Sequence, residues 1–270
     1  MTPPIEQLEV VTVAGRPRPL HHEDVSRNGN GANGNGRGPT LPMIQGTVVD
    51  PAEVSAEVER MSADEAIAWA IERFHPSLRF AVSFQKTSSV TMHIAHGLEP
   101  DARFFYIDTE LLFPETYEIR DRLAEHFGIS FERFVQDNPP GLVDRWKADE
   151  WGADDECCAP RKVATMRRAL VGIDCWVSGV RRVDSDTRAS APKFGWDERF
   201  GLWKLNPLAD WDDKQIWNYI KDHHVPYNPL HDQGFPSIGC MPCTSVPGDG
   251  EDSRAGRWAG TDRTECGING

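Results

Sequence analysis

Six cysteines are the side chains of this 270-residue chain with the clearest potential for chemistry. Four of them form two pairs, Cys157-Cys158 and Cys240-Met-Pro-Cys243. Four thiolates in two pairs can bind Zn²⁺ or an iron–sulfur cluster. Adjacent cysteines depart from the usual zinc-finger spacing, and they suit two different irons of one cubane. The pairs therefore favour one [4Fe–4S] cluster over zinc, with four unrelated buried cysteines or a disulfide as the alternatives.

The other two cysteines lie in contrasting sequence environments. Cys266 lies near the C-terminal end, in a glycine-rich and charged segment. A thiol on an exposed, mobile segment is either a nucleophile or a site of oxidative damage. Cys266 is therefore the candidate catalytic residue, with a chance exposed thiol as the alternative. Cys175 lies in an apolar run, which predicts a core position.

Two segments combine hydroxyl or acidic groups with the end of an apolar run. In the segment Ser83–Ser89, backbone N–H groups and hydroxyls at a strand-to-helix turn would favour an anion such as phosphate. A helix N-cap without a ligand is an equally good interpretation, and the glycines of a Walker A loop are missing. For the segment 105–110, which contains Asp108, turn and capping chemistry before Pro114 is the stronger interpretation.

Basic residues recur against an acidic background. Arg188 follows an acidic, hydroxyl-rich loop, and Arg254 and Arg257 lie near Cys266, so a local anion site is one interpretation and solvated surface the other. Arg167 and Arg168 fit the surface interpretation. The histidines, including His231, show no metal-ligand spacing and are expected at the surface or in packing.

The order of apolar segments predicts how these residues are positioned. Short apolar runs alternate with helical patterns, which predicts a parallel twisted α/β sheet with helices on both faces. Strands are expected at 78–83, 103–108, 129–135, 175–179 and 203–206, and helices within 52–74 and at 87–95, 114–127, 161–170 and 212–222. In such sheets ligands bind at the carboxyl ends of the strands.

Composition limits the function classes and the domain organisation. The formal net charge of −13 argues against a nucleic-acid partner. The chain has neither a long apolar run nor a signal-peptide pattern, which predicts no membrane association and a cytoplasmic location. Residues 27–40 contain nine Gly or Asn, so residues 1–45 are expected to be a disordered tail. Residues 50–245 are then the α/β domain, and residues 246–270 a mobile C-terminal catalytic tail.

Taken together and in order, the motifs of residues 60–270 resemble the assimilatory sulfonucleotide reductases of the adenine nucleotide alpha hydrolase-like (Rossmann-like) superfamily. The resemblance rests on the loop Ser83–Ser89, the Cys157-Cys158 pair, IDTELLFPETY (107–117), SGVRRVDSDTRAS (178–190), KLNPLADWDDKQIWNYI (204–220), VPYNPLHDQGFPSIGCMPCT (225–244) and TECGI (264–268). The four paired cysteines resemble the branch that reduces adenylyl sulfate (APS) and carries a [4Fe–4S] cluster.

The resemblance implies an enzyme of sulfate assimilation and cysteine biosynthesis that works in two stages. Cys266 attacks the sulfur of APS, AMP leaves, and an S-sulfocysteine forms; thioredoxin or a similar dithiol protein then releases sulfite. The cluster would be bound by Cys157, Cys158, Cys240 and Cys243. The residues implied to bind substrate are Ser83, Thr87, Ser88, Ser89, Lys162, Gly179, Arg188, Arg254 and Arg257. A homo-oligomer is compatible with the sequence, which does not specify one.

This chain departs from the family pattern at two positions, and two alternative functions are kept beside APS reduction. Many relatives have Gly after Ser83, where this chain has Phe84, and many end with His where this chain has Asn269. The first alternative is reduction of 3′-phosphoadenylyl sulfate (PAPS), a branch that typically lacks the four cysteines. The second is an ATP pyrophosphatase-type nucleotidyl transferase of the same fold, which would not need Cys266.

Overall fold

A six-stranded, mostly parallel sheet forms the centre of the protein. The computed structural model describes residues 42–136, 158–259 and 265–268. The strand order is β5-β4-β3-β6-β8-β7, and every neighbouring pair is parallel except β7 and β8. The strands are β3 (Leu78–Ala81), β4 (Phe104–Asp108), β5 (Glu132–Val135), β6 (Cys175–Val177), β7 (Phe194–Asp197) and β8 (Leu202–Leu205).

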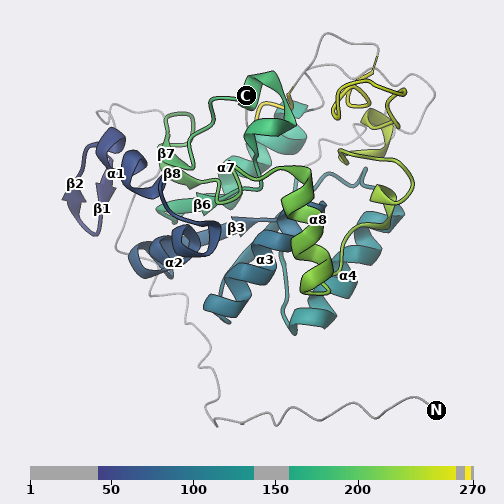
Figure 1. The fold of residues 1–270 in the computed structure, drawn as a ribbon. Coiled ribbons are helices and arrows are strands. Elements are labelled where there is room, and N and C mark those ends of the chain that lie inside the picture. Colours follow the sequence, from purple (N-terminus) through teal and green to yellow (C-terminus); the bar gives the residue numbers. More distant parts are fainter. Residues whose placement is uncertain (1–41, 137–157, 260–264, 269–270) are drawn as a thin grey trace.

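Helices cover both faces of the sheet, as the alternation of segments predicts. The helices are α1 (Pro51–Val58), α2 (Ala63–Phe74), α3 (Lys86–Leu98), α4 (Pro114–Phe127), α7 (Thr165–Ala169) and α8 (Asp213–Asp222). In Figure 1, α2, α3, α4 and α8 lie below the sheet and α7 lies above it. None of the helices in the described ranges is long and apolar enough to cross a membrane.

Alternate residues of the central strands β4 and β6 face two separate hydrophobic clusters. On β4, Phe104 and Tyr106 pack into the cluster beneath the sheet, whereas Phe105 packs into the cluster beside α7. On β6, Cys175 and Trp176 divide in the same way. This period of two, with apolar residues on both faces, is typical of a parallel strand that is buried on both sides.

The N-terminal part of the described chain contains a hairpin that the sequence did not reveal. Met43–Ile44 (β1) pairs with Thr47–Val48 (β2), although residues 1–45 were predicted to be a disordered tail. The tail prediction is therefore wrong for its last residues, because Gln45 and Gly46 both adopt positive φ and form the tight turn that two-residue hairpins require. Residues 1–41 lie outside the described residues.

Two further elements differ from the pattern-based expectation. β7 was not predicted; it is an edge strand, antiparallel to β8, and its alternating sequence FGWD is only four residues long, too short a run to indicate a strand by itself. The helix expected at 161–170 divides into a π-helix at Ala159–Ala164, which contains Lys162, and the α-helix α7. A π-helical turn changes the direction of side chains within a helix and is frequent at functional sites.

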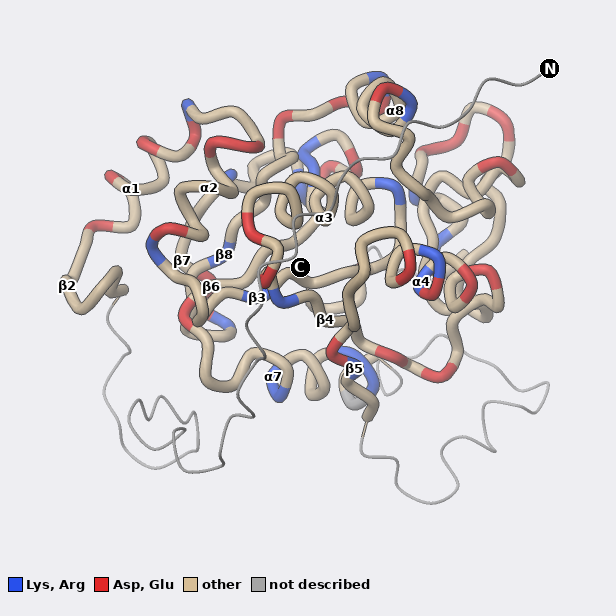
Figure 2. The backbone as a smooth tube through the Cα atoms, turned by 90° about the horizontal axis from the view of Figure 1, so that it is seen from below, with Lys and Arg blue, Asp and Glu red and all other residues tan. Residues whose placement is uncertain are grey.

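The topology fixes where a ligand can bind. From β3 the chain adds β4 and β5 on one side, and it then crosses to add β6 on the other side of β3. The crevice at the carboxyl ends of β3 and β6 is therefore the point at which the strand order reverses, which is where open α/β sheets bind ligands. Along the backbone, Lys and Arg positions alternate with Asp and Glu positions (Figure 2).

Candidate active site

A cavity of about 230 Å³ lies at this point of strand reversal. Its walls include the ends of β3, β4 and β6, the π-helix and the C-terminal segment. Eight of the predicted site residues line it, and they come from five separate parts of the chain: Ser83, Thr87, Lys162, Gly179, Arg188, Arg254, Arg257 and Cys266. Cys240, one of the predicted metal ligands, lines it too.

Of the four residues in the loop after β3 that were predicted to bind substrate, two line the cavity and two do not. Ser83 and Thr87 line the cavity, whereas Ser88 and Ser89 are buried away from it. The Ser88 hydroxyl donates to the carbonyl oxygen of Gln85 at 2.8 Å, as a residue in the first turn of α3 can. The N-cap residue of α3 is Gln85, and no side chain caps it, so the serines do not act as the N-cap, and anion binding by Ser83 and Thr87 stays a prediction.

Phe84 explains how the loop turns without a glycine after Ser83. Its φ of 58° lies in the left-handed region, which usually favours glycine. The ring is 1% exposed and packs edge-on against Tyr106 and Phe131 at centroid distances of 5.1 and 5.2 Å. Burial of an aromatic ring thus stabilises a backbone conformation that costs on the order of 1 kcal/mol.

Gly179 lies in close contact with this loop. A Cβ atom there would lie 2.9 Å from Thr87 Oγ1, so a side chain at this position would require the Thr87 hydroxyl to move. The turn after β6 therefore approaches the N-terminus of α3 closely. Both turns border the cavity, so this contact sets the distance between two of its walls.

Cationic side chains gather on the wall next to Cys266. Lys162 and the three arginines Arg188, Arg254 and Arg257 all line the cavity. The Arg257 guanidinium lies 4.6 Å from the ring centre of Trp258 and donates to Ser237 Oγ and to the carbonyl oxygen of Ile238, both at 3.3 Å. Gly239 leaves room for that guanidinium, since a Cβ there would collide with it.

The positive charges on this wall act on one another. Burial and the neighbouring guanidinium of Arg188 lower the pKa of Arg254 to about 10. Burial alone would lower the pKa of Lys162, but the nearby thiols of Cys240, Cys266 and Cys158, when ionised, raise it above its ordinary value. The wall can therefore stabilise added negative charge, and Lys162 remains an ammonium among sulfur atoms.

Three of the four paired cysteines lie close to that ammonium. Cys158, Cys240 and Cys243 are buried, and Cys240 and Cys243 pack with Trp258. Thr109 Oγ1 lies 3.2 Å from Cys240 Sγ. Burial opposes ionisation of Cys240, yet Lys162 and Thr109 lower its pKa overall. Burial and the charge of Cys240 raise the pKa of Cys243 to about 11.

These thiols are a suitable donor set for a soft metal centre. Cys157 lies outside the described residues. Within the described ranges, no three His, Cys, Asp or Glu side chains are arranged to hold a single metal ion. The thiols come from the two segments that the sequence predicted, and the backbone of Met241 donates to Leu111 O at 2.7 Å, which ties the second segment to β4's end.

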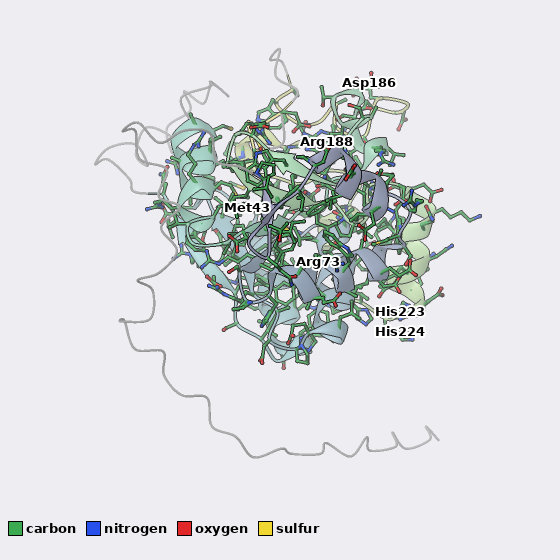
Figure 3. The ribbon with its side chains drawn as sticks, turned by 90° about the vertical axis from the view of Figure 1, so that its left-hand side faces the viewer. Met43, Arg73, Asp186, Arg188, His223 and His224 are labelled. Atoms are coloured by element: carbon green, nitrogen blue, oxygen red, sulfur yellow. The ribbon has the colours of Figure 1, made fainter. Side chains whose placement is uncertain are left out.

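The other sequence interpretations have clear structural outcomes. Asp108 is structural, as the capping interpretation predicts: it accepts hydrogen bonds from Tyr117 Oη and Glu110 N, both at 2.8 Å. Cys175 is fully buried in β6. Arg188 lies at the end of the molecule opposite to His223 and His224, so those two histidines are remote from the site (Figure 3).

Five charged residues of the cavity lining are not among the predicted substrate ligands: Lys86, Arg181, Asp184, Asp213 and Glu265. Lys86 Nζ pairs with Asp213 Oδ1 at 3.0 Å, and Asp213 also accepts from Arg181 at 2.8 Å. Glu265, next to Cys266, pairs with Arg188 and Arg254. The available signals were the position of Lys86 within the loop and the direct adjacency of Glu265 to the candidate nucleophile, whereas nothing in the sequence pairs Asp213 with Lys86.

His231 contacts the loop after β3, and this contact makes the stability of the protein depend on pH. Its Nε2 accepts a hydrogen bond from the backbone N–H of Lys86 at 3.1 Å, and its Nδ1 lies 2.7 Å from the carbonyl oxygen of Phe235. The first contact requires a neutral ring, and the second assigns the proton to Nδ1. Burial accordingly lowers the pKa of His231 to about 4. The packing role predicted for this histidine is confirmed.

The free energy of unfolding is expected to drop by about 2 kcal/mol between pH 7 and pH 5 through His231 alone. The unfolded chain takes up a proton near its ordinary pKa of about 6.5, whereas the folded chain does so only near 4. The stabilisation is therefore complete above pH 7, and it is lost as the pH falls through the unfolded pKa. Urea unfolding of the protein and of His231→Gln at both pH values measures the difference, and equal pH dependence of the two would contradict it.

Comparisons with known proteins agree with this architecture. Residues 77–246 match the protein family described as phosphoadenosine phosphosulfate reductase domain. The chain is 39% identical to an adenosine 5′-phosphosulfate reductase of Staphylococcus haemolyticus, over 80% of this chain and 90% of the relative. It is also 39% identical to the enzyme of the same name from Salinibacter ruber, over 81% and 88% of the two chains.

Solved structures confirm the predicted fold class. A phosphoadenylyl-sulfate (PAPS) reductase from Candida auris, in complex with phosphate, superposes with a TM-score of 0.64 and 26% identity, covering 74% of this chain and all of that one. An FMN adenylyltransferase from Candida glabrata, 13% identical, superposes with a TM-score of 0.50 over 72% of both chains. The second likeness concerns the fold alone.

Proposed function

Since the chain belongs to the phosphoadenosine phosphosulfate reductase family, we propose that it is an oxidoreductase that converts APS to sulfite and AMP. The curated relatives at 39% identity carry the APS reductase name. The observation that carries the proposal is the position of Cys266, a thiol on the cavity wall among Lys162 and three arginines. A nucleophile beside four cations suits attack on a doubly anionic substrate.

The first step transfers the sulfo group to the protein. The Cys266 thiolate attacks the sulfur of APS, an S–S bond forms, and the bond from that sulfur to the phosphate oxygen breaks. AMP leaves with that electron pair, and Cys266 becomes an S-sulfocysteine. Arg188, Arg254 and Arg257 stabilise the charge that develops on the phosphate and sulfo oxygens, because preformed cations in a partly buried cavity need little reorganisation.

The second step needs a dithiol reductant, for which thioredoxin or a protein like it is our proposal. One thiolate attacks the Cys266 sulfur and sulfite leaves with the electron pair of the S–S bond. The second thiol then resolves the mixed disulfide, so that the dithiol is oxidised by two electrons and the Cys266 thiol is restored. The partial exposure of Cys266 supports this step, because an adduct there can be reached by a second protein.

Support for a [4Fe–4S] cluster comes from the donor set. Cys158, Cys240 and Cys243 are buried near one another with Lys162 as a counter-charge, and Cys157 is adjacent in sequence to the first of them. These four would hold the cluster, which when bound would place further charge and polarisability beside Lys162. The attack by Cys266 requires no electron from it.

Anaerobically purified protein is expected to contain about four iron and four sulfide per chain. The variant Cys240→Ser should lose most of that iron, because one of four ligands is removed. Iron and acid-labile sulfide assays measure both results. Stoichiometric zinc without iron would overturn the cluster proposal, and it would leave the Cys266 chemistry unaffected.

Reduction of PAPS is the second candidate, and the family description and the Candida auris structure favour it. The four paired cysteines and the curated relatives favour APS instead. Turnover of an equimolar mixture of the two nucleotides separates the candidates, and preferred consumption of PAPS would replace our proposal with the second.

The decisive experiment is intact-mass analysis after the protein is mixed with APS in the absence of reductant. A gain of one SO₃ that maps to Cys266, with release of one AMP, is the expected result. Release of AMP without a covalent adduct, or an adduct on another cysteine, would refute the proposed mechanism. Added thioredoxin with its reductase should then remove the adduct as sulfite.

A further inference from the structure

Glu265 occupies the arginines that the substrate needs. Its Oε1 accepts from Arg188 Nε at 2.7 Å, and its Oε2 accepts from Arg188 Nη2 at 2.8 Å, so one complete edge of that guanidinium is engaged. Arg254 Nη2 donates to the same Oε2 at 3.1 Å. The carboxylate is 8% exposed, and both arginines are 11% exposed.

We propose that Glu265 is a positioning residue that holds Cys266 against Arg188 and Arg254 until an anionic group of the nucleotide displaces it. The proposal rests on the proposed function, in which those two arginines bind the phosphate and sulfo groups. The carboxylate and the nucleotide then compete for the same donors, and the residue next to the nucleophile senses whether the cavity is filled.

The charge balance of the cavity supports this competition. Burial alone would raise the pKa of Glu265, but Arg188 and Arg254 lower it overall, so the residue is an anion at neutral pH. Bidentate pairing with arginine is the same geometry that phosphate and sulfo groups use. Glu265 therefore supplies from within the chain the interaction that the substrate would supply from outside.

The other side of Cys266 is attached independently. Arg199 Nη1 donates to the carbonyl oxygen of Gly267 at 3.3 Å, and Ile268 packs against the hydrophobic cluster beside α7. Cys266 is thus held between two attachments, of which only the Glu265 side uses substrate-binding groups. Displacement of Glu265 would free one side of the nucleophile and leave the other in place.

The variant Glu265→Gln tests the proposal, because it keeps the size of the side chain and removes its charge. The amide also places an NH₂ group against arginine donors. Glu251→Gln is the matched control: it makes the same change in the C-terminal segment, where the exposed carboxylate accepts only from Gly248 N at 2.8 Å among the hydrogen bonds described for it. The full-length chain is used throughout.

Three measurements test whether Glu265 has this positioning role. Without ligand, iodoacetamide should alkylate Cys266 at least about threefold faster in Glu265→Gln, as peptide mapping and intact mass report, because one attachment is lost. The Kd for AMP should fall by about tenfold, the order expected when one charge-assisted contact no longer competes. At saturating APS the single-turnover sulfonation rate should stay within about threefold of that of the unmodified protein, because bound APS has already displaced Glu265 from the arginines.

A structural role would weaken AMP binding or leave it unchanged, and either result would overturn the proposal. An unchanged alkylation rate at Cys266 would also overturn it. If AMP bound to none of the three proteins, the proposed function would fail, and the ligand-free alkylation comparison would still decide whether Glu265 holds Cys266. Glu251→Gln should match the unmodified protein in all three measurements.

Discussion

Replacing Cys266 with serine is expected to abolish sulfite formation, with a loss of at least about a thousandfold, while the Kd for AMP stays within about threefold. A cysteine thiol supplies some thiolate near neutral pH, whereas a serine hydroxyl is essentially un-ionised. The cations of the cavity wall remain in Cys266→Ser, so the binding of the nucleotide should persist. Sulfite release with a dithiol reductant measures the reaction, and equilibrium dialysis measures AMP binding.

Cys175→Ala is the control for this substitution. Cys175 is fully buried in β6, and it packs into a different hydrophobic cluster from its cavity-lining neighbour Trp176. Its truncation should therefore cost about 1 kcal/mol of stability and leave sulfite formation intact. If Cys266→Ser still formed sulfite at near the original rate, the nucleophile would have to be another group. Loss of AMP binding together with turnover would instead assign Cys266 a part in shaping the cavity.

Replacing Lys162 with methionine is expected to slow the transfer of the sulfo group to Cys266 by about a hundredfold. Methionine preserves much of the length and apolar stem of the side chain and removes its charge. The ammonium is the counter-charge of the Cys240 and Cys266 sulfurs, so its loss leaves developing negative charge without compensation in a buried place. Single-turnover intact-mass measurements with APS report the rate.

Lys221→Met provides the comparison, because Lys221 is exposed in the last turn of α8 and distant from the cavity lining. A Lys162→Met rate within about threefold of the Lys221→Met rate would show that the ammonium is dispensable. Iron content should be measured alongside. A Lys162→Met protein that transferred slowly but kept its iron would place the effect on the substrate rather than on the cysteines.

The sequence predicted the central sheet well, because its information is local. Buried parallel strands such as β4 are continuous apolar runs, and α4 begins at Pro114 and ends before Gly128, two strong boundary signals. The capping box of Ser62 with Glu65, which begins α2, is a local signal of the same kind. The edge strand β7 was missed because its pairing with β8, not its composition, makes it a strand.

The site could be predicted where the type of a residue by itself indicates a chemical role. Cys266 and the arginines could be selected by type, and the resemblance placed them in one site. The buried hydroxyls of Ser88 and Ser89 could not be told from those of Ser83 and Thr87, because helix geometry decides which of them faces the cavity. The partners of Lys86 and Glu265 depend on tertiary contacts that leave no pattern in the sequence.

The parts of the chain that build the cavity have a consequence for the order of folding. All strands of the central sheet lie between residues 78 and 205, whereas the wall around Cys266 also needs residues 237–258 and 265–268. These late segments contact residues more than a hundred positions earlier, such as the Leu112–Cys240 bridge. Contacts that close such long loops form after local ones. The β3–β4 and β4–β5 pairs can therefore form before the segments around Cys266 are in place, and a partly folded chain would have part of its core before it has any reactivity.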